Sequence, residues 1–267
     1  MKAQQPVNNN WLELLQFPLQ GRSQKPRQKG LTMILDKGLG VEETRELLQT
    51  AGTFIDMIKL GFGTSALYPQ KVLDEKIDLA RNYGIDIYPG GTFLEIALLQ
   101  HKLKEFLKMA KTMGYTAIEV SDGTASIPPE VRASAVAQAA DLGFKVLTEI
   151  GKKNPLDWVP VEKSLEQIHA DLKNGASNII VEGRESGMNT GLYDREGHLD
   201  RNHVNLMLSA VDKPERLIWE APLKEQQQAF ILEYGPDINM GNIPPFEVIA
   251  LEALRVGLRS DTLRSVL

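Results

Sequence analysis

The sequence predicts a single (β/α)₈ barrel, the TIM-barrel fold, and two observations lead to this prediction. Eight short apolar runs alternate with eight amphipathic helical patterns, and the starts of the runs recur every 20 to 39 residues with no linker between them. The chain of 267 residues also has the ordinary length of one such barrel. A doubly wound sheet is the competing architecture, but it would have fewer strands and no closure.

The expected strands are rich in Ile, Val and Leu, which is typical of strands buried on both faces. They are expected at residues 31–36, 55–60, 85–88, 117–121, 145–150, 178–182, 217–220 and 237–240. The expected helices carry apolar residues three and four apart and cover residues 41–51, 70–82, 93–113, 129–142, 164–174, 202–211, 224–234 and 246–258. Glycine follows many of these helices, as it does at helix C-termini: Gly52, Gly84, Gly114, Gly143, Gly175 and Gly235.

Residues 1–30 are expected to form a partly flexible N-terminal extension, and residues 31–267 the catalytic barrel. The extension carries Arg22, Lys25, Arg27 and Lys29, which we interpret as a solvated lead-in segment in preference to an anion-binding or nucleic-acid-binding arm. Its first twenty residues do not resemble a signal peptide.

Composition excludes several classes of protein. The chain has no cysteine, which rules out disulfides, thiolate metal sites and cysteine nucleophiles. A net charge of −5 gives no general electrostatic reason to bind nucleic acid, and no apolar run reaches the roughly 20 residues of a membrane span. We therefore expect a soluble cytoplasmic protein without nucleic-acid or membrane partners.

Carboxylates stand at the expected ends of several strands, where the active site of such a barrel lies. Glu149, Glu182 and Glu220 occupy equivalent positions on consecutive strands, and Asp36 ends the first strand. Hard oxygen ligands of this kind suit Mg²⁺, so these four residues form the expected metal site. The alternative is that the acids pair with neighbouring lysines and with Arg184 inside the barrel mouth.

Cationic and glycine-rich segments at the same strand ends indicate an anion-binding site. Backbone N–H groups of glycine-rich loops can hold a phosphate without obstruction by side chains, and Arg184 suits bidentate recognition of an oxyanion. The expected substrate-binding residues are Lys37, Lys59, Gly63, Thr64, Ser65, Gly90, Gly91 and Thr92. Each loop alone is equally consistent with an ordinary turn.

Two lysines follow the fifth strand. Side chains alternate along a strand, so an inward Glu149 places Lys153 inward and Lys152 towards the rim. Lys153 is the candidate for proton transfer, because nearby cations lower the pKa of a lysine towards a useful range. Lys152 and Arg184 complete the catalytic candidates, although Lys152 is equally consistent with a solvated surface lysine. The four histidines lack zinc-site spacing, and the serines lack the hydrolase GxSxG context.

Several motifs resemble the phosphosulfolactate synthase family from about Gly30 to Thr262. They are LDKGL (35–39), KLGFGTSA (59–66), YPGGT (88–92), EVSDG (119–123), LTEIGKK (147–153), VEGRESG (181–187), EAP (220–222) and RVGLRSDT (255–262). The resemblance implies a (β/α)₈ enzyme that adds sulfite to phosphoenolpyruvate, with Mg²⁺, to give (R)-2-O-phospho-3-sulfolactate, a step that leads towards coenzyme M in methanogens. It also implies a homo-oligomer, such as a trimer.

Two alternatives remain at this point. One is a different lyase on the same barrel, acting on another enolphosphate or with another nucleophile. The other is a non-enzymatic relative, because plant heat-stress-associated proteins resemble this family. A decayed site would be expected to lose its charges, and this chain keeps acids, lysines and an arginine at most strand ends.

Overall fold

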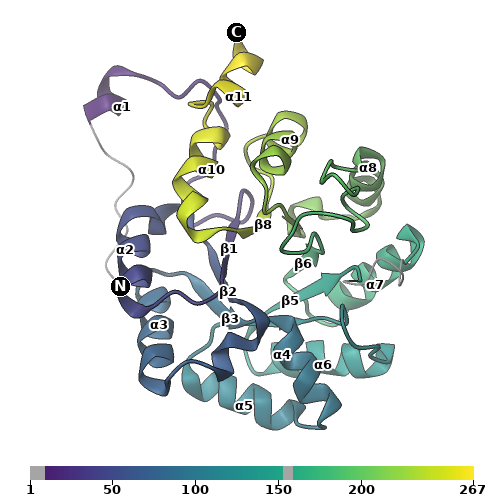
Figure 1. Ribbon diagram of the computed structural model, residues 1–267. Helices are drawn as coiled ribbons and strands as arrows, with labels where there is room; N and C mark the ends of the chain where they lie inside the picture. The colour runs from purple at the N-terminus through teal and green to yellow at the C-terminus, as the bar shows by residue number, and fades with distance from the viewer. Residues whose placement is uncertain (1–9, 153–158) are drawn as a thin grey trace.

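The computed structural model describes residues 10–152 and 159–267 and shows eight parallel strands surrounded by helices (Figure 1). The strands are β1 (Thr32–Asp36), β2 (Met57–Leu60), β3 (Asp86–Pro89), β4 (Ala117–Val120), β5 (Lys145–Ile150), β6 (Asn178–Val181), β7 (Leu217–Glu220) and β8 (Met240–Ile243). Their order around the sheet is β3-β2-β1-β8-β7-β6-β5-β4. The two ends of that order meet where the Thr116 N–H donates to the Ile87 carbonyl at 3.2 Å. The predicted barrel is therefore confirmed.

Most of the helices follow strands and cover the outside of the barrel, whereas the first precedes β1 and has no buried residue. Their bounds are α1 (Asn10–Leu14), α2 (Val41–Ala51), α3 (Gln70–Asn82), α4 (Gly91–Leu99), α5 (Leu103–Met113), α6 (Pro129–Asp141), α7 (Val161–Lys173), α8 (Arg201–Ala210), α9 (Lys224–Tyr234), α10 (Val248–Arg255) and α11 (Ser260–Leu263). A short 3₁₀ segment, Gly61–Ala66, follows β2.

Several predicted elements begin or end up to three residues away from their bounds in the structure, and two differ most. The predicted helix 93–113 is two helices, because His101 takes a left-handed φ of 55° and the Lys102 N–H closes back on the Ala97 carbonyl at 2.8 Å. Glycine is the usual residue at this left-handed position after a helix. Because histidine stands there, the sequence does not indicate that the helix ends. The eighth strand begins at Met240, three residues later than predicted, because Arg255 takes the Ile238 carbonyl and Asp237 accepts from Ser23.

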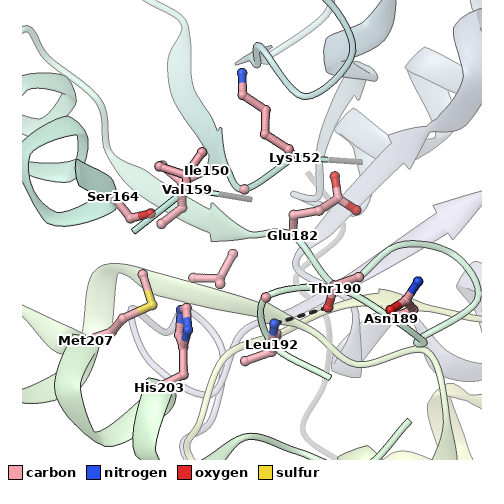
Figure 2. A pocket seen from close by; sticks show the side chains of 13 residues that line it. Ile150, Lys152, Val159, Ser164, Glu182, Asn189, Thr190, Leu192, His203 and Met207 are labelled. Carbon is pink, nitrogen blue, oxygen red and sulfur yellow. Dashed lines mark hydrogen bonds between the residues drawn. The ribbon is translucent and has the colours of Figure 1, made fainter. Parts of the chain in front are cut away.

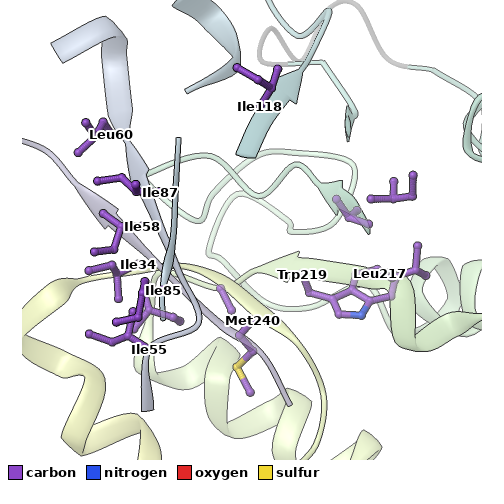
Figure 3. Packing of buried hydrophobic residues seen from close by; sticks show 14 of the residues in the cluster. Ile34, Ile55, Ile58, Leu60, Ile85, Ile87, Ile118, Leu217, Trp219 and Met240 are labelled. Atoms are coloured by element: carbon purple, nitrogen blue, oxygen red, sulfur yellow. The ribbon is translucent and has the colours of Figure 1, made fainter. Parts of the chain in front are cut away.

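Buried side chains form two groups on either side of the strand ring. The outward faces pack under the helices, and Figure 3 shows Ile34, Ile58 and Ile87 of three adjacent strands side by side in this layer. The inward faces fill the barrel interior with Leu31, Met33, Met57, Tyr88, Ala117, Leu147, Ile180 and Ile218. This alternation is what the period of two in a strand requires.

The described part of the N-terminal segment packs against the barrel. The Arg22 guanidinium pairs with Glu252 at 2.8 Å, and Arg27 pairs with Asp56 at 3.0 Å, with both arginine side chains almost fully buried. The Leu19 N–H donates to the Val256 carbonyl, so the segment runs beside the C-terminal helices, as Figure 1 shows. The arginines are therefore neither solvated nor available to an anion, which corrects the interpretation from sequence.

Candidate active site at the carboxyl ends of the strands

Five charged side chains stand one step above the apolar layer inside the barrel. Each lies two residues beyond an interior residue of its own strand, as Glu149 does beyond Leu147. The period of two therefore turns all five towards the barrel axis. They are Lys59 on β2, Glu119 on β4, Glu149 on β5, Glu182 after β6 and Glu220 on β7, and all five are buried.

The Lys59 ammonium lies among three of these glutamates. Its Nζ is 3.0 Å from Glu119 Oε2, 2.9 Å from Glu149 Oε2 and 3.3 Å from Glu220 Oε1. Burial lowers the pKa of Lys59, but the three carboxylate charges outweigh burial and raise that pKa well above its ordinary value. Lys59 is thus a fixed cation within an acidic cluster. The sequence predicts Lys59 as a substrate-binding residue, and the structure gives it three carboxylate partners.

Glu149, Glu182 and Glu220 can converge on one ion. Each offers one carboxylate oxygen, and the three oxygens lie within 4.8 Å of one another. Because a Mg²⁺–oxygen bond is about 2.1 Å, ligand oxygens on opposite sides of one ion lie about 4.2 Å apart, so a small inward movement would suffice. Three hard anionic oxygens match the preference of Mg²⁺. The residues present therefore fit a Mg²⁺ site.

Backbone groups hold two of the glutamates in place. The Gly91 N–H donates to Glu119 Oε1 at 2.8 Å, and the Gly183 N–H donates to Glu220 Oε2 at 3.0 Å. Both positions require glycine, since a Cβ on Gly91 would lie 2.5 Å from Glu119 Oε1 and one on Gly183 would collide with the Glu220 carbonyl. These glycines therefore let loop backbone approach the acids closely.

A second layer of ion pairs supports the cluster from outside the barrel. Arg132 on α6 donates to the Glu149 carbonyl at 2.9 Å and forms ion pairs with Asp171 on α7 at 2.7 Å and with Asp122 at 3.0 Å. Glu95 on α4 holds the loop after β4 by accepting from the N–H groups of Thr124 and Ala125. Helices and strands are thus tied together at the level of the site.

The structure places Asp36 apart from the three glutamates. Its Oδ2 pairs with Lys76 on α3 at 2.6 Å, and its Oδ1 accepts from the N–H groups of Gly38 and Leu39. Tyr68 donates to the same Oδ1 at 3.3 Å. With both oxygens engaged, Asp36 shapes the loop after β1, and the trio of glutamates is the candidate metal site without it.

Most of the glycine-rich segments serve the fold in this structure. The N–H groups of Gly90 and Gly91 donate to Leu60 and Glu119, so neither is free to hold a phosphate. The Ser65 hydroxyl accepts from Tyr115 at 2.8 Å and lines a groove between α3, α4 and α5, outside the barrel. These residues make structural contacts here, because local turn chemistry resembles anion-binding chemistry, and their role in substrate binding stays a prediction.

Gly63, Thr64 and Thr92 lie in the loops that follow β2 and β3. Gly63 has a φ of +67° and lies against Phe93. Thr64 Oγ1 is buried without a hydrogen-bond partner among the described residues, and Thr92 is half-buried at the start of α4. These three remain substrate-binding predictions.

The remaining cations stand around the rim. Lys37 pairs with Glu185 at 2.6 Å, with both side chains half-exposed. Lys152 donates to Asp122 Oδ2 at 2.7 Å, and Figure 2 shows its ammonium pointing away from the Glu182 carboxylate.

Arg184 takes a left-handed φ of 60°, and its backbone N–H donates to Glu182 Oε1 at 2.7 Å. Its guanidinium forms no ion pair within residues 10–152 and 159–267. Lys153, the proton-transfer candidate, lies outside the described residues.

Glu119 is the member of the cluster that sequence reasoning missed. The sequence predicts Glu119 within the strand 117–121, without a role in the site. The signal was available, because Glu119 follows the buried Ala117 by two residues, as Glu149 follows Leu147. The sequence could not show that the side chain of Lys59, sixty positions earlier, would reach Glu119.

A cavity of about 280 Å³ opens beside Glu182, between the ends of β5 and β6 and the helices α7 and α8. Figure 2 shows its lining: Glu182, Asn189 and Thr190 lie on one side, and His203 and Met207 on the other. Burial lowers the pKa of His203 below its ordinary value. The imidazole is therefore a neutral polar group in this cavity near neutral pH.

His203 should make the folded state sensitive to acid. Because its folded pKa lies below the unfolded one, the unfolded chain takes up the proton first, so stability is full above about pH 6.5 and falls as pH drops through the folded pKa. We expect His203→Gln to lose less unfolding free energy between about pH 7.5 and about pH 5 than the wild type, measured by urea denaturation. His169→Gln, at an exposed histidine, is the control and should behave as wild type. An identical acid response in His203→Gln would contradict the assignment.

Comparison with known proteins assigns the chain to one family. The model of the (2R)-phospho-3-sulfolactate synthase (ComA) family matches residues 20–261. Phosphosulfolactate synthases from Methanothermobacter thermautotrophicus and Bacillus subtilis are 43% and 37% identical to it, over 92% and 93% of this chain and 95% and 97% of theirs. The Protein HEAT-STRESS-ASSOCIATED 32 of Arabidopsis thaliana is 22% identical over 88% of both chains.

Solved structures support the fold. The 3-hexulose-6-phosphate synthase from Salmonella typhimurium aligns with a TM-score of 0.56 at 13% identity, over 86% of this chain and all of that one. The YdjI aldolase from Escherichia coli aligns at 0.54 over 90% of each chain, at 14% identity. Within the described residues, no helix is both long and apolar enough to cross a bilayer. With the family model spanning most of the barrel and three curated synthases above 35% identity, the chain belongs to the phosphosulfolactate synthase family.

Proposed function

We propose that this protein adds sulfite to phosphoenolpyruvate to give (R)-2-O-phospho-3-sulfolactate, with Mg²⁺ as its metal and a lysine as its general acid. The names of the curated relatives support the reaction. The buried acidic cluster at the barrel mouth is the observation that carries the proposal, because such a concentration of charge has no role in holding a barrel together and is costly to bury.

The reaction forms one carbon–sulfur bond and one carbon–hydrogen bond. The sulfur lone pair of sulfite attacks the methylene carbon of phosphoenolpyruvate, and the electron pair of the double bond moves towards the substrate carboxylate. A proton then reaches the carbon that bears the phosphate, and no group leaves. The protein must therefore bring two anions together, stabilise added negative charge and deliver one proton.

Glu149, Glu182 and Glu220 are the residues proposed to hold the Mg²⁺ ion. When bound, the ion supplies positive charge to the substrate carboxylate as negative charge develops there. Gly183 and Arg132 keep two of these acids in place, through Glu220 Oε2 and the Glu149 carbonyl. The protein's own contribution is thus a preorganised set of oxygen donors.

Cations at the rim are proposed to bind the substrate phosphate and sulfite. Arg184 lies two residues after Glu182 and its backbone N–H donates to that carboxylate, and Lys37 and Lys152 lie in the loops after β1 and β5. Lys153, which follows the end of β5 by three residues, is proposed as the acid that protonates the carbon bearing phosphate and so fixes its configuration. Small anions are the proposed partners, and we also propose a cytoplasmic homo-oligomer, such as a trimer, on the basis of the family resemblance.

An assay with phosphoenolpyruvate and sulfite, with and without Mg²⁺, tests the proposal. We expect Mg²⁺-dependent formation of phosphosulfolactate, identified by mass spectrometry and by NMR of the C–S product. Omitting sulfite should leave phosphoenolpyruvate unconsumed, since a different lyase would consume it. If folded, Mg²⁺-supplied protein consumed neither substrate, the proposed reaction would be overturned, in favour of a lyase for another enolphosphate or of a non-enzymatic relative.

A further inference from the structure

Among the residues that the structure describes, Lys59 is a cation inside the acidic cluster, and its position affects how the cluster binds a divalent ion. Its Nζ contacts Glu149 Oε2 at 2.9 Å and Glu220 Oε1 at 3.3 Å, and both residues belong to the trio that fits Mg²⁺. Nζ also contacts Glu119 at 3.0 Å. The ammonium is buried, so water cannot shield its charge from an ion bound a few ångströms away.

We propose that Lys59 is a built-in counter-cation that competes with the divalent ion for the glutamate cluster, so that the protein binds a free divalent ion weakly. This inference rests on the metal site of the proposed function and adds a residue that sets its affinity. Lys59 is a positioning residue in this role, since it acts through the glutamates.

Charge balance explains why such a residue is needed. Glu119, Glu149, Glu182 and Glu220 are all at most 4% exposed, and four buried carboxylates would repel one another strongly. One ammonium among them reduces the formal charge of the cluster from −4 to −3. Lys59 therefore stabilises the cluster in the absence of metal, and the same charge repels an incoming cation.

Competition for oxygen atoms adds to this repulsion. Lys59 occupies one carboxylate oxygen of Glu149 and one of Glu220, and the second oxygen of Glu220 accepts from the Gly183 N–H. A divalent ion that uses Glu220 must share an oxygen with one of these donors. Replacing Lys59 removes one competing contact from each of the two carboxylates at once.

Binding of Mn²⁺ in the absence of any substrate tests the inference, with free Mn²⁺ measured by electron paramagnetic resonance. Lys59→Met should bind Mn²⁺ about tenfold more tightly or better, because a buried like charge at this distance is worth at least that factor. The control is Lys145→Met, which removes a lysine paired with Asp86 at 2.8 Å at the opposite end of the barrel. It should leave the affinity unchanged.

A double variant separates local competition from overall charge. Lys59→Met/Glu119→Gln keeps the formal charge of the cluster at its wild-type value and leaves the trio intact. It should still bind Mn²⁺ more tightly than wild type, because the ammonium beside Glu149 and Glu220 is gone. Glu119→Gln alone should bind more weakly than wild type. Equal affinity of the double variant and wild type would mean that net charge alone sets binding.

Thermal denaturation covers the case in which Lys59→Met folds poorly. Without Mn²⁺ this variant should melt at a lower temperature than wild type, and Mn²⁺ should raise its melting temperature by more than it raises that of wild type. Weaker or unchanged Mn²⁺ binding, or a smaller thermal shift, would overturn the inference and make Lys59 an organiser of the cluster.

Failure of the inference can be told apart from failure of the proposed function. If Glu182→Gln did not weaken Mn²⁺ binding in the Lys59→Met background, the ion would lie elsewhere and both the inference and the metal assignment would fall. The proposed reaction is tested by product formation. If the protein formed the product but Lys59→Met bound Mn²⁺ no more tightly than wild type, only the inference would be overturned.

Discussion

Replacing Glu182 by glutamine should lower the turnover of phosphoenolpyruvate and sulfite by about two to three orders of magnitude, with the fold intact. Glu182 is one of three residues whose oxygens can meet on one ion, and loss of its charge removes an anionic ligand. Glutamine has almost the same shape and keeps an oxygen that can accept from the Arg184 N–H, as Glu182 Oε1 does at 2.7 Å. The variant therefore separates charge from packing.

The measurement is steady-state kinetics at several Mg²⁺ concentrations. We expect the Mg²⁺ requirement of Glu182→Gln to shift upwards together with the fall in kcat. Glu225→Gln, at an exposed position on α9, makes the same chemical change outside the site and should stay within about twofold of wild type. A Glu182→Gln protein with wild-type kcat and Mg²⁺ dependence would remove Glu182 from the metal site.

Much of the site follows from local rules that act along each strand. The alternation of side chains predicted that Glu149 and Glu220 face inward, and the spacing of the strands predicted that their ends share one mouth. The same rules apply to Glu119, whose strand is as short and as buried. Its omission from the predicted site was therefore an incomplete use of the rule.

The partners of these side chains could not be predicted in the same way. Asp36 and Glu149 both lie near the ends of strands. Asp36 forms an ion pair with Lys76 on α3, whereas Glu149 forms one with Lys59 on β2. These pairs join residues 40 and 90 positions apart. Which lysine reaches which acid depends on side-chain reach and on the tilt of helices against the sheet, and neither is written in the periodicity of a single segment.

Partners that are distant in the sequence also explain why two of the basic N-terminal residues are buried. Arg22 and Arg27 form a charge-rich, apolar-poor stretch that is typical of solvated segments. In the folded protein their partners are Glu252 and Asp56, which stand 230 and 29 positions away. Buried carboxylates at the N-terminal end of the barrel thus convert a segment that looks solvated into one that covers the barrel end.

Replacing Arg132 by methionine should destabilise the protein by about 3–5 kcal/mol, because breaking a buried ion pair leaves an uncompensated charge in the interior. The Arg132 guanidinium donates to Asp171 at 2.7 and 3.1 Å, and the Asp171 and Arg132 side chains are both 1% exposed. Without the arginine, Asp171 keeps Gln167 as a hydrogen-bond donor at 2.8 Å. It loses the cation with which it forms an ion pair among the described residues. The Glu149 carbonyl also loses a donor, so activity should fall as well.

Urea denaturation of three variants separates the buried charge from the lost packing. Arg45→Met removes an arginine whose pair with Glu42 is exposed, so it should change the unfolding free energy by less than about 0.5 kcal/mol. Arg132→Met/Asp171→Leu removes both charges and should recover a large part of the loss, since the penalty comes from the unpaired carboxylate. A double variant no more stable than Arg132→Met would place the energy in packing of the arginine stem between α6 and α7. A loss below about 1 kcal/mol in Arg132→Met would show that Asp171 finds another way to be neutralised.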